Sequence, residues 1–169
     1  YADLLAQPFI KLATQGHSSA GYYFYDVVGK INHKFSDKDR LYLSFYGGND
    51  RAYFKEKYSE TYQSTSYESQ NKFDLAWGNK IVAARWNHLF SPKLFGNFMG
   101  TLSTFKFGVG NDYIDKETTN GVTQTSKFGF NYDSGIRDWT AKADFDWFAS
   151  PGHLVRFGVY EINHKFTPG

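Results

Sequence analysis

The sequence predicts an all-β fold: an antiparallel up-and-down transmembrane β-barrel segment of about six strands. Three observations predict it: long stretches in which apolar and polar residues alternate, short polar turns after every second stretch, and 20% aromatic residues. Mean hydropathy is low, at −0.55, and no apolar run approaches the ~20 residues of a spanning helix. A barrel strand tolerates such polarity, because only every second residue faces lipid.

Charge and cysteine content exclude several other classes of protein. The net charge is +2, with cations and anions interspersed, so no basic tract predicts nucleic-acid binding. The chain has no cysteine, which removes disulfides, thiolate metal sites and cysteine catalysis. Residues 1–12 lack a signal-peptide pattern, and we expect both chain ends to lie inside a longer protein. No enzyme activity and no cofactor are predicted.

The first two predicted strands lie near residues 21–35 and 41–54. In the first strand one face is apolar and aromatic, and the other is mostly polar. The apolar face carries Tyr23, Tyr25, Val27, Gly29, Ile31, His33 and Phe35, and the opposite face carries Phe24, Asp26, Val28, Lys30, Asn32 and Lys34. A polar turn at residues 36–39 then leads to Leu41, Leu43 and Phe45 on one face of the second strand.

Four more strands are predicted near residues 73–90, 94–110, 128–149 and 154–166. The two faces of the 94–110 strand are hard to assign. Short turns at 91–93 and 150–153 follow the third and fifth strands, whereas polar segments at 49–71 and 112–127 read as long loops. Residues 1–20 read as another loop or flank at that end, and residues 21–169 as the partial barrel. Tight turns at one end and long loops at the other are typical of outer-membrane barrels, whose loops are extracellular.

Strands of a dozen residues or more are long enough to cross the apolar band of an outer membrane. The alternation predicts eight residues that face lipid: Val27, Ile31, Leu43, Val82, Ala84, Trp139, Ala143 and Phe145. It predicts four that face the lumen: Asp26, Lys30, Arg85 and Asp144. The sequence INHKF at residues 31–35 recurs at 162–166, and WNHLF at 86–90 is a variant. The copies at 31–35 and 86–90, and Trp147, precede short turns, where a periplasmic aromatic girdle is expected.

Several segments together resemble the barrel of TonB-dependent receptors. They are residues 22–26 (YYFYD), 30–44 (KINHKFSDKDRLYLS), 77–79 (WGN), 85–90 (RWNHLF), 134–138 (SGIRD) and 157–159 (FGV). The likeness is to the Bacteroidota-type branch, whose members often carry a carboxypeptidase-regulatory-like domain before the plug. It implies a 22-stranded barrel with an N-terminal plug and a TonB box. The chain matches only a middle portion of that barrel, and neither plug nor TonB box is seen in it.

The resemblance implies import of a scarce nutrient across the cell outer membrane of a Gram-negative bacterium, with a siderophore, glycan, peptide or vitamin as the substrate. Implied partners are outer-membrane lipid, the rest of the barrel with its plug, TonB through the N-terminal region, and a surface lipoprotein or other complex subunits. Two alternatives stay open. One is a structural or assembly subunit without transport, and the other is a soluble carbohydrate-binding β-sandwich.

Three residue sets suggest possible chemistry. His33, His88 and His164 lack metal-ligand spacing, so we interpret them as girdle or strand-surface residues. Asp138, Asp144 and Asp146 could form a glycosidase pair, but we favour a lumen-facing row neutralised by Lys142, Lys30, Lys34 and Arg85. The loop aromatics could either pack on one another or stack on a sugar or another ligand, because tyrosine supplies contact area at low entropic cost. The best candidates are Tyr53, Tyr58, Tyr62 and Tyr67.

Overall fold

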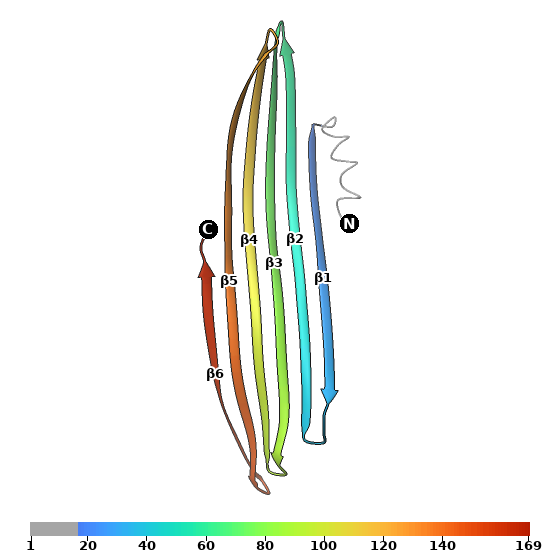
Figure 1. Ribbon diagram of the computed structural model, residues 1–169, viewed down its shortest axis with the longest axis vertical. Coiled ribbons are helices and arrows are strands. Elements are labelled where there is room, and N and C mark those ends of the chain that lie inside the picture. The colour runs from blue at the N-terminus through green and yellow to red at the C-terminus, as the bar shows by residue number, and fades with distance from the viewer. Residues whose placement is uncertain (1–16) are drawn as a thin grey trace.

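The computed structural model describes residues 17–169, and they form one antiparallel sheet with six strands in sequence order. The strands are β1 (Ser18–Lys34), β2 (Asp39–Tyr62), β3 (Thr65–Ser91), β4 (Leu94–Thr119), β5 (Val122–Ser150) and β6 (His153–Thr167). Each strand pairs with the next one in the chain, which confirms the predicted all-β up-and-down fold. Figure 1 shows these long strands side by side, with β1 and β6 at the two edges.

The prediction of long loops at 49–71 and 112–127 is wrong. Both segments continue as paired strands and close in two-residue turns at 63–64 and 120–121. Asn120 and Gly121 both have positive φ, at 50° and 81°, as a type I′ turn requires. The polar side chains of these segments do not prevent strand formation, because each segment is hydrogen-bonded along its length to a neighbouring strand. Most of the predicted flank, residues 1–20, lies outside the described part of the chain.

The strands reach far beyond what a membrane crossing needs. Strands β2 to β5 contain 24 to 29 residues, or about 80–95 Å at ~3.3 Å per residue. A tilted strand crosses the apolar core of a bilayer with about 10 residues. We call the end with the turns at 35–38, 92–93 and 151–152 the lower end, and the end with the turns at 63–64 and 120–121 the upper end (Figure 1).

The described sheet has no second layer. None of its hydrophobic side chains is buried, and many large ones, including Ile31, Phe128 and Val159, are about 70% exposed. A soluble β-sandwich of this chain would cover one face with a second sheet, and within residues 17–169 all six strands belong to one sheet. The same residues contain no helix of the length and apolarity that a membrane crossing requires.

Candidate functional site

The two faces of the sheet are defined by the strand register, because direct partners on neighbouring strands point to the same side. We name them the Val27 face and the Lys30 face, after one residue of β1 on each. All eight residues predicted to face lipid lie together on the Val27 face. With their apolar neighbours they form a continuous surface over the lower half of the sheet, which we call the apolar stripe. Its members are Tyr23, Tyr25, Val27, Ile31, Leu41, Leu43, Phe45, Val82, Ala84, Trp86, Phe98, Leu102, Trp139, Ala141, Ala143, Phe145, Trp147, Val155, Phe157 and Val159.

The apolar stripe runs diagonally across the strands. On β1 it extends upward from Ile31 to Tyr23, whereas on β6 it extends downward from Val159 to Val155. Val159 belongs to the row of cross-strand partners that contains His33 on β1. From β1 to β6 its upper edge therefore descends by ten residues, from Tyr23 to the row of Val159. From β2 to β5 the upper edge is level, because Phe45, Val82, Leu102 and Trp139 are direct cross-strand partners. With ~3.3 Å per residue and ~4.8 Å between strands, the offset of the two edges between β1 and β6 averages to a tilt of roughly 40–55°.

The lower turns follow the same slope. The Leu89 amide of β3 donates to the Lys38 carbonyl at 2.8 Å, and β3 then continues to Ser91 beyond that turn. The Phe148 amide of β5 donates to the Lys93 carbonyl at 2.8 Å, and β5 continues to Ser150. Each hairpin thus projects past the previous one, and Figure 1 shows the turns stepping down from β1–β2 to β5–β6. The turns and the apolar stripe therefore both lie lower at β6 than at β1.

Aromatic rings gather on the Val27 face near the lower turns. Phe98 stacks on Trp86 and meets Phe145 edge to face, with ring centroids 5.2 and 5.6 Å apart. Phe145 in turn stacks on Phe157 at 5.2 Å, and Phe90 lies 6.2 Å from Phe145. Such a cluster of amphipathic and aromatic rings at one edge of an apolar band is typical of an interfacial girdle.

The lower half of the Lys30 face is mostly polar. It carries all four residues predicted to face the lumen, Asp26, Lys30, Arg85 and Asp144, but the structure does not bring them together. Asp26 and Lys30 lie on β1, two strands from Arg85 and four from Asp144. Each has its own surroundings: Asp26 accepts a hydrogen bond from the Tyr46 hydroxyl at 2.8 Å, and the Arg85 guanidinium lies 4.2 Å from the Tyr42 ring centroid.

The acidic row of β5 is neutralised locally. Asp144 pairs with Lys142 at 2.9 Å, as predicted, and Asp146 accepts from Arg156 at 3.1 Å. Asp138 contacts the Nδ1 atom of His164 at 2.8 Å. The prediction that Lys30, Lys34 and Arg85 also neutralise this row is wrong, because these residues lie on β1 and β3, which do not adjoin β5.

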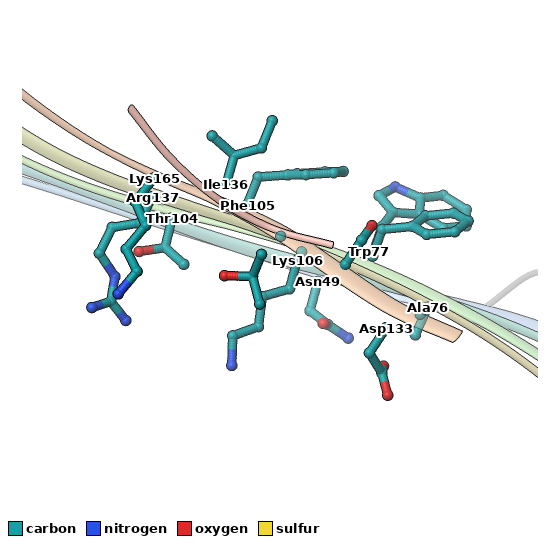
Figure 2. A pocket seen from close by; sticks show the side chains of 16 residues that line it. Asn49, Ala76, Trp77, Thr104, Phe105, Lys106, Asp133, Ile136, Arg137 and Lys165 are labelled. Carbon is teal, nitrogen blue, oxygen red and sulfur yellow. The ribbon is translucent and has the colours of Figure 1, made fainter. Parts of the chain in front are cut away.

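The apolar side chains change faces halfway up the sheet. Above the stripe the Val27 face becomes charged and the Lys30 face becomes apolar and aromatic. We call this second surface the upper aromatic patch; it comprises Tyr22, Phe24, Phe54, Phe73, Leu75, Trp77, Phe105, Phe107, Val109, Phe128, Phe130, Tyr132 and Ile136. Figure 2 shows the division at one level: Trp77, Phe105 and Ile136 lie on one side of the strands, and Lys106, Asp133 and Arg137 on the other.

Sequence reasoning missed the upper aromatic patch, although β4 carries its signal. Phe98 and Leu102 occupy even positions, whereas Phe105, Phe107 and Val109 occupy odd ones. This change of phase made the faces of the 94–110 strand hard to assign. A β-bulge would also change the phase, but the only register shifts in residues 17–169 lie near the lower turns, at Leu89/Ser91 and Phe148/Ser150. The apolar residues therefore do exchange sides.

Ring contacts join the patch across strands. Tyr22 of β1 stacks on Trp77 of β3, with centroids 6.3 Å apart, and contacts Phe24 at 5.8 Å. The Tyr22 hydroxyl donates to Asp50 of β2 between them. Phe24 and Phe128 remain exposed at 58% and 71%. An exposed apolar surface of this extent marks an interaction or ligand surface.

The four candidate tyrosines are divided between the faces. Tyr58, Tyr62 and Tyr67 lie on the Lys30 face near the turn at 63–64, continuing the upper aromatic patch. Tyr53 lies on the Val27 face, where its ring covers Gly21; a Cβ atom at Gly21 would come within 2.5 Å of that ring. Tyr53 therefore does not belong to the same surface as the other three.

An ion cluster holds the upper part of β2 to β3 on the Val27 face. Asp74 accepts from Arg51 at 2.8 Å and pairs with Lys72 at 2.6 Å. Burial alone would raise the pKa of Asp74, but the bonds from Lys72 and Arg51 outweigh it and hold that pKa below its usual value. The same pairing raises the pKa of Arg51. Asp74 is therefore ionised at neutral pH.

The histidines occupy separate places. His88 contacts Asp39 at 2.6 Å, and His33 meets Phe35 edge to face at 4.6 Å; both lie on the Val27 face near the lower turns. His164 lies on the opposite face beside Asp138. Within residues 17–169, no three His, Cys, Asp or Glu side chains are placed to hold a metal ion.

Comparison with known proteins gives only remote likenesses. No family model matches the sequence, and no curated protein matches it. Among solved structures, the chain is similar to "Structure of the RagAB peptide importer in the 'open-open' state", with a TM-score of 0.45, 9% identity and coverage of 87% of this chain. "Structure of the RagAB peptide transporter" gives 0.34, 10% and 86%. The Ail protein of Yersinia pestis gives 0.18, 10% and 88%.

The chain spans 18% and 20% of the two RagAB chains and 95% of Ail. TM-scores below 0.5 establish no shared fold.

Proposed function

We propose that the chain forms part of the wall of a TonB-dependent nutrient importer in the outer membrane of a Gram-negative bacterium. The observation that carries the proposal is the diagonal apolar stripe backed by a polar face. A β-barrel is the only sheet that can span lipid, because it leaves no unpaired edge, and its strands must tilt. A horizontal apolar band on tilted strands lies at different levels on distant strands, as the stripe does on β1 and β6.

The dimensions of the stripe support this placement. On β5 it extends from Trp139 to Trp147, about 27–30 Å along the strand at ~3.3 Å per residue. The tilt of roughly 40° that is typical of outer-membrane barrels reduces this length to about 22 Å of height, close to their ~25 Å apolar band. The aromatic cluster then lies at the periplasmic interface, and the upper halves of the hairpins project outside the cell.

The upper aromatic patch supports import rather than a purely structural role. In this placement it lines the inner surface of the barrel mouth, above a polar lumen that contains Asp26, Lys30, Arg85 and Asp144. Aromatic rings there offer stacking and apolar contact to an incoming solute, with Tyr58, Tyr62 and Tyr67 at the outermost edge. The TonB-dependent assignment is supported by the resemblance of the sequence motifs, and the substrate class is open among siderophores, glycans, peptides and vitamins.

The test uses the full-length protein in its own outer membrane. A strain with the gene deleted is compared with one that carries the gene on three media: oligopeptides as sole nitrogen source, glycans as sole carbon source, and siderophore-bound iron. We expect a growth defect on at least one medium. We expect the double variant Trp77→Ala/Phe107→Ala to share this defect while remaining in the outer membrane as a heat-modifiable band.

The matched control is Phe157→Ala, which removes a ring from the apolar stripe and should not alter uptake. A deletion strain that grows normally on every medium, with the heat-modifiable barrel present in its parent, would instead favour the structural or assembly alternative. A protein that stays soluble would overturn the membrane placement itself.

A further inference from the structure

Four cations lie on the Val27 face above the apolar stripe. Lys80 of β3 and Arg137 of β5 are the next residues on this face above Val82 and Trp139 of the stripe. Lys165 of β6 is the direct cross-strand partner of Arg137. With Lys106 of β4 we call these four the basic quartet, and Figure 2 shows three of them on the same side of the sheet.

The basic quartet forms no ion pair within the described sheet, although Asp133 and Glu161 lie on the same face. Within residues 17–169 no ion pair involves Lys80, Lys106, Arg137 or Lys165, although other cations on the same face are paired, as Arg51 and Lys72 are with Asp74. Like charges directly opposite each other, as Arg137 and Lys165 are, destabilise a sheet. An external anion bound between them would remove this repulsion.

The quartet borders a groove that continues onto the apolar stripe. One hollow of about 490 Å³ is lined by Lys106, Arg137 and Lys165, with Asp133 and Asn49 also on its wall. A second hollow of about 490 Å³ is lined by Lys80 and Lys106 together with Val27 and Phe45 of the stripe. The two share Asn49, Gly78, Thr104 and Lys106, so they adjoin each other. Charge and apolar surface therefore meet in one concave site.

We propose that the basic quartet binds the phosphate groups of an outer-leaflet lipid, whose acyl chains lie along the apolar stripe. This inference rests on the proposed membrane placement, which puts the quartet at the extracellular interface of the bilayer. An anion fits the site because none of the four cations is ion-paired in the part of the chain that the structure describes, and an amphiphile fits because the hollows border both the quartet and the stripe. Clustered Lys and Arg residues at a membrane interface bind anionic headgroups in this way. Arg137 can bind a phosphate through two parallel hydrogen bonds.

The test measures lipid binding to the purified full-length protein. Native mass spectrometry in neutral detergent follows a titration with diphosphorylated lipid A and, separately, with the same lipid after removal of its phosphates. We expect the unmodified protein to prefer the phosphorylated form at least tenfold. We expect the variant Lys80→Gln/Lys106→Gln/Arg137→Gln/Lys165→Gln to lose that preference.

The matched control removes the same charge from the same face nearer the upper end: Lys55→Gln/Lys57→Gln/Lys116→Gln/Lys127→Gln. Its affinity should stay within about twofold of the unmodified protein. The pair variant Arg137→Gln/Lys165→Gln should lose part of the preference. It keeps the site testable if the fourfold variant does not fold.

Three results would overturn the inference. A heat-modifiable quartet variant that still prefers phosphorylated lipid would remove the site and leave the barrel proposal intact. Displacement of the lipid by inorganic phosphate at millimolar concentration would identify a site for free phosphate. An unmodified protein that forms no heat-modifiable barrel would refute the membrane placement and this inference together.

Discussion

Val27 on the first strand and Lys165 on the last lie in the same row of cross-strand partners and on the same face of the sheet. One belongs to the apolar stripe and the other to the basic quartet. A flat, untilted sheet with one buried face would place similar residues along such a row. The difference follows if the boundary between lipid and water crosses the strands at an angle, as it does in a tilted barrel.

A charge in the centre of the apolar stripe should be costly. We expect Ala143→Arg to reduce the unfolding free energy of the full-length protein in lipid vesicles by about 2–4 kcal/mol, the range for Arg or Lys at the middle of the bilayer. Thr140→Arg, which faces the opposite side of β5, is the matched control and should cost much less. Urea titration of both variants checks the prediction, and equal stabilities would refute the assignment of the faces.

The direction of the strands can be tested by surface labelling in intact cells. Ser64 lies in the upper turn of β2–β3 and Thr119 beside that of β4–β5, whereas Lys38 and Lys93 lie in lower turns. A cysteine at either of the first two positions should react with a membrane-impermeant maleimide. A cysteine at Lys38 or Lys93 should react only after the cells are opened. The reverse pattern would place the upper aromatic patch in the periplasm.

Six strands are too few to close a membrane barrel. The smallest single-chain barrels have eight, and in the described sheet β1 and β6 each pair with only one neighbour. Unpaired backbone groups at these edges are not tolerated in lipid. We expect the 169-residue polypeptide, expressed by itself, not to form a heat-modifiable, detergent-stable monomer. A monomeric band that shifts on heating would contradict this.

The turn at 120–121 needs glycine at its second position. Gly121 has φ = 81° and no side chain near it, while Asn120 tolerates its φ of 50° better than most residues. We expect Gly121→Val to destabilise the upper part of the β4–β5 hairpin by roughly 1–2 kcal/mol. Hydrogen exchange of the peptides covering residues 112–130 should accelerate. Asn120→Gly is the control and should leave exchange unchanged.

The ion cluster of Arg51, Lys72 and Asp74 should make the stability of the β2–β3 hairpin depend on pH in the acidic range. Because the pKa of Asp74 is lowered in the folded protein, its contribution to stability is complete above the usual Asp pKa of about 3.9 and is lost as the pH falls through the lowered value. Asp74→Asn should therefore lower the Tm at pH 6 but have a smaller effect at pH 2.5. An equal loss at both pH values would show that the carboxylate charge is not involved.

The sequence by itself determined the all-β class, the number of strands, the three lower turns and the two faces of the lower half. These features follow from alternation and turn residues, which are local: Leu41, Leu43 and Phe45 share a face in any extended strand. The sequence predicts loops at residues 49–71 and 112–127 because polar side chains predominate there without clear alternation. Their strand structure depends on hydrogen bonds to a neighbouring strand, which the local sequence does not reveal.

Only the tertiary structure decided what depends on register. Alternation in the sequence cannot distinguish a β-bulge from a true exchange of faces. The upper aromatic patch on the Lys30 face follows from the pairing of β4, which has no register shift between Phe98 and Phe107. The same holds for the pairing of Asp146 with Arg156, the separation of Tyr53 from Tyr58, and the diagonal course of the apolar stripe. Each is a relation between residues on different strands. The register between strands depends on contacts between residues that are distant in the sequence, which a local pattern does not show.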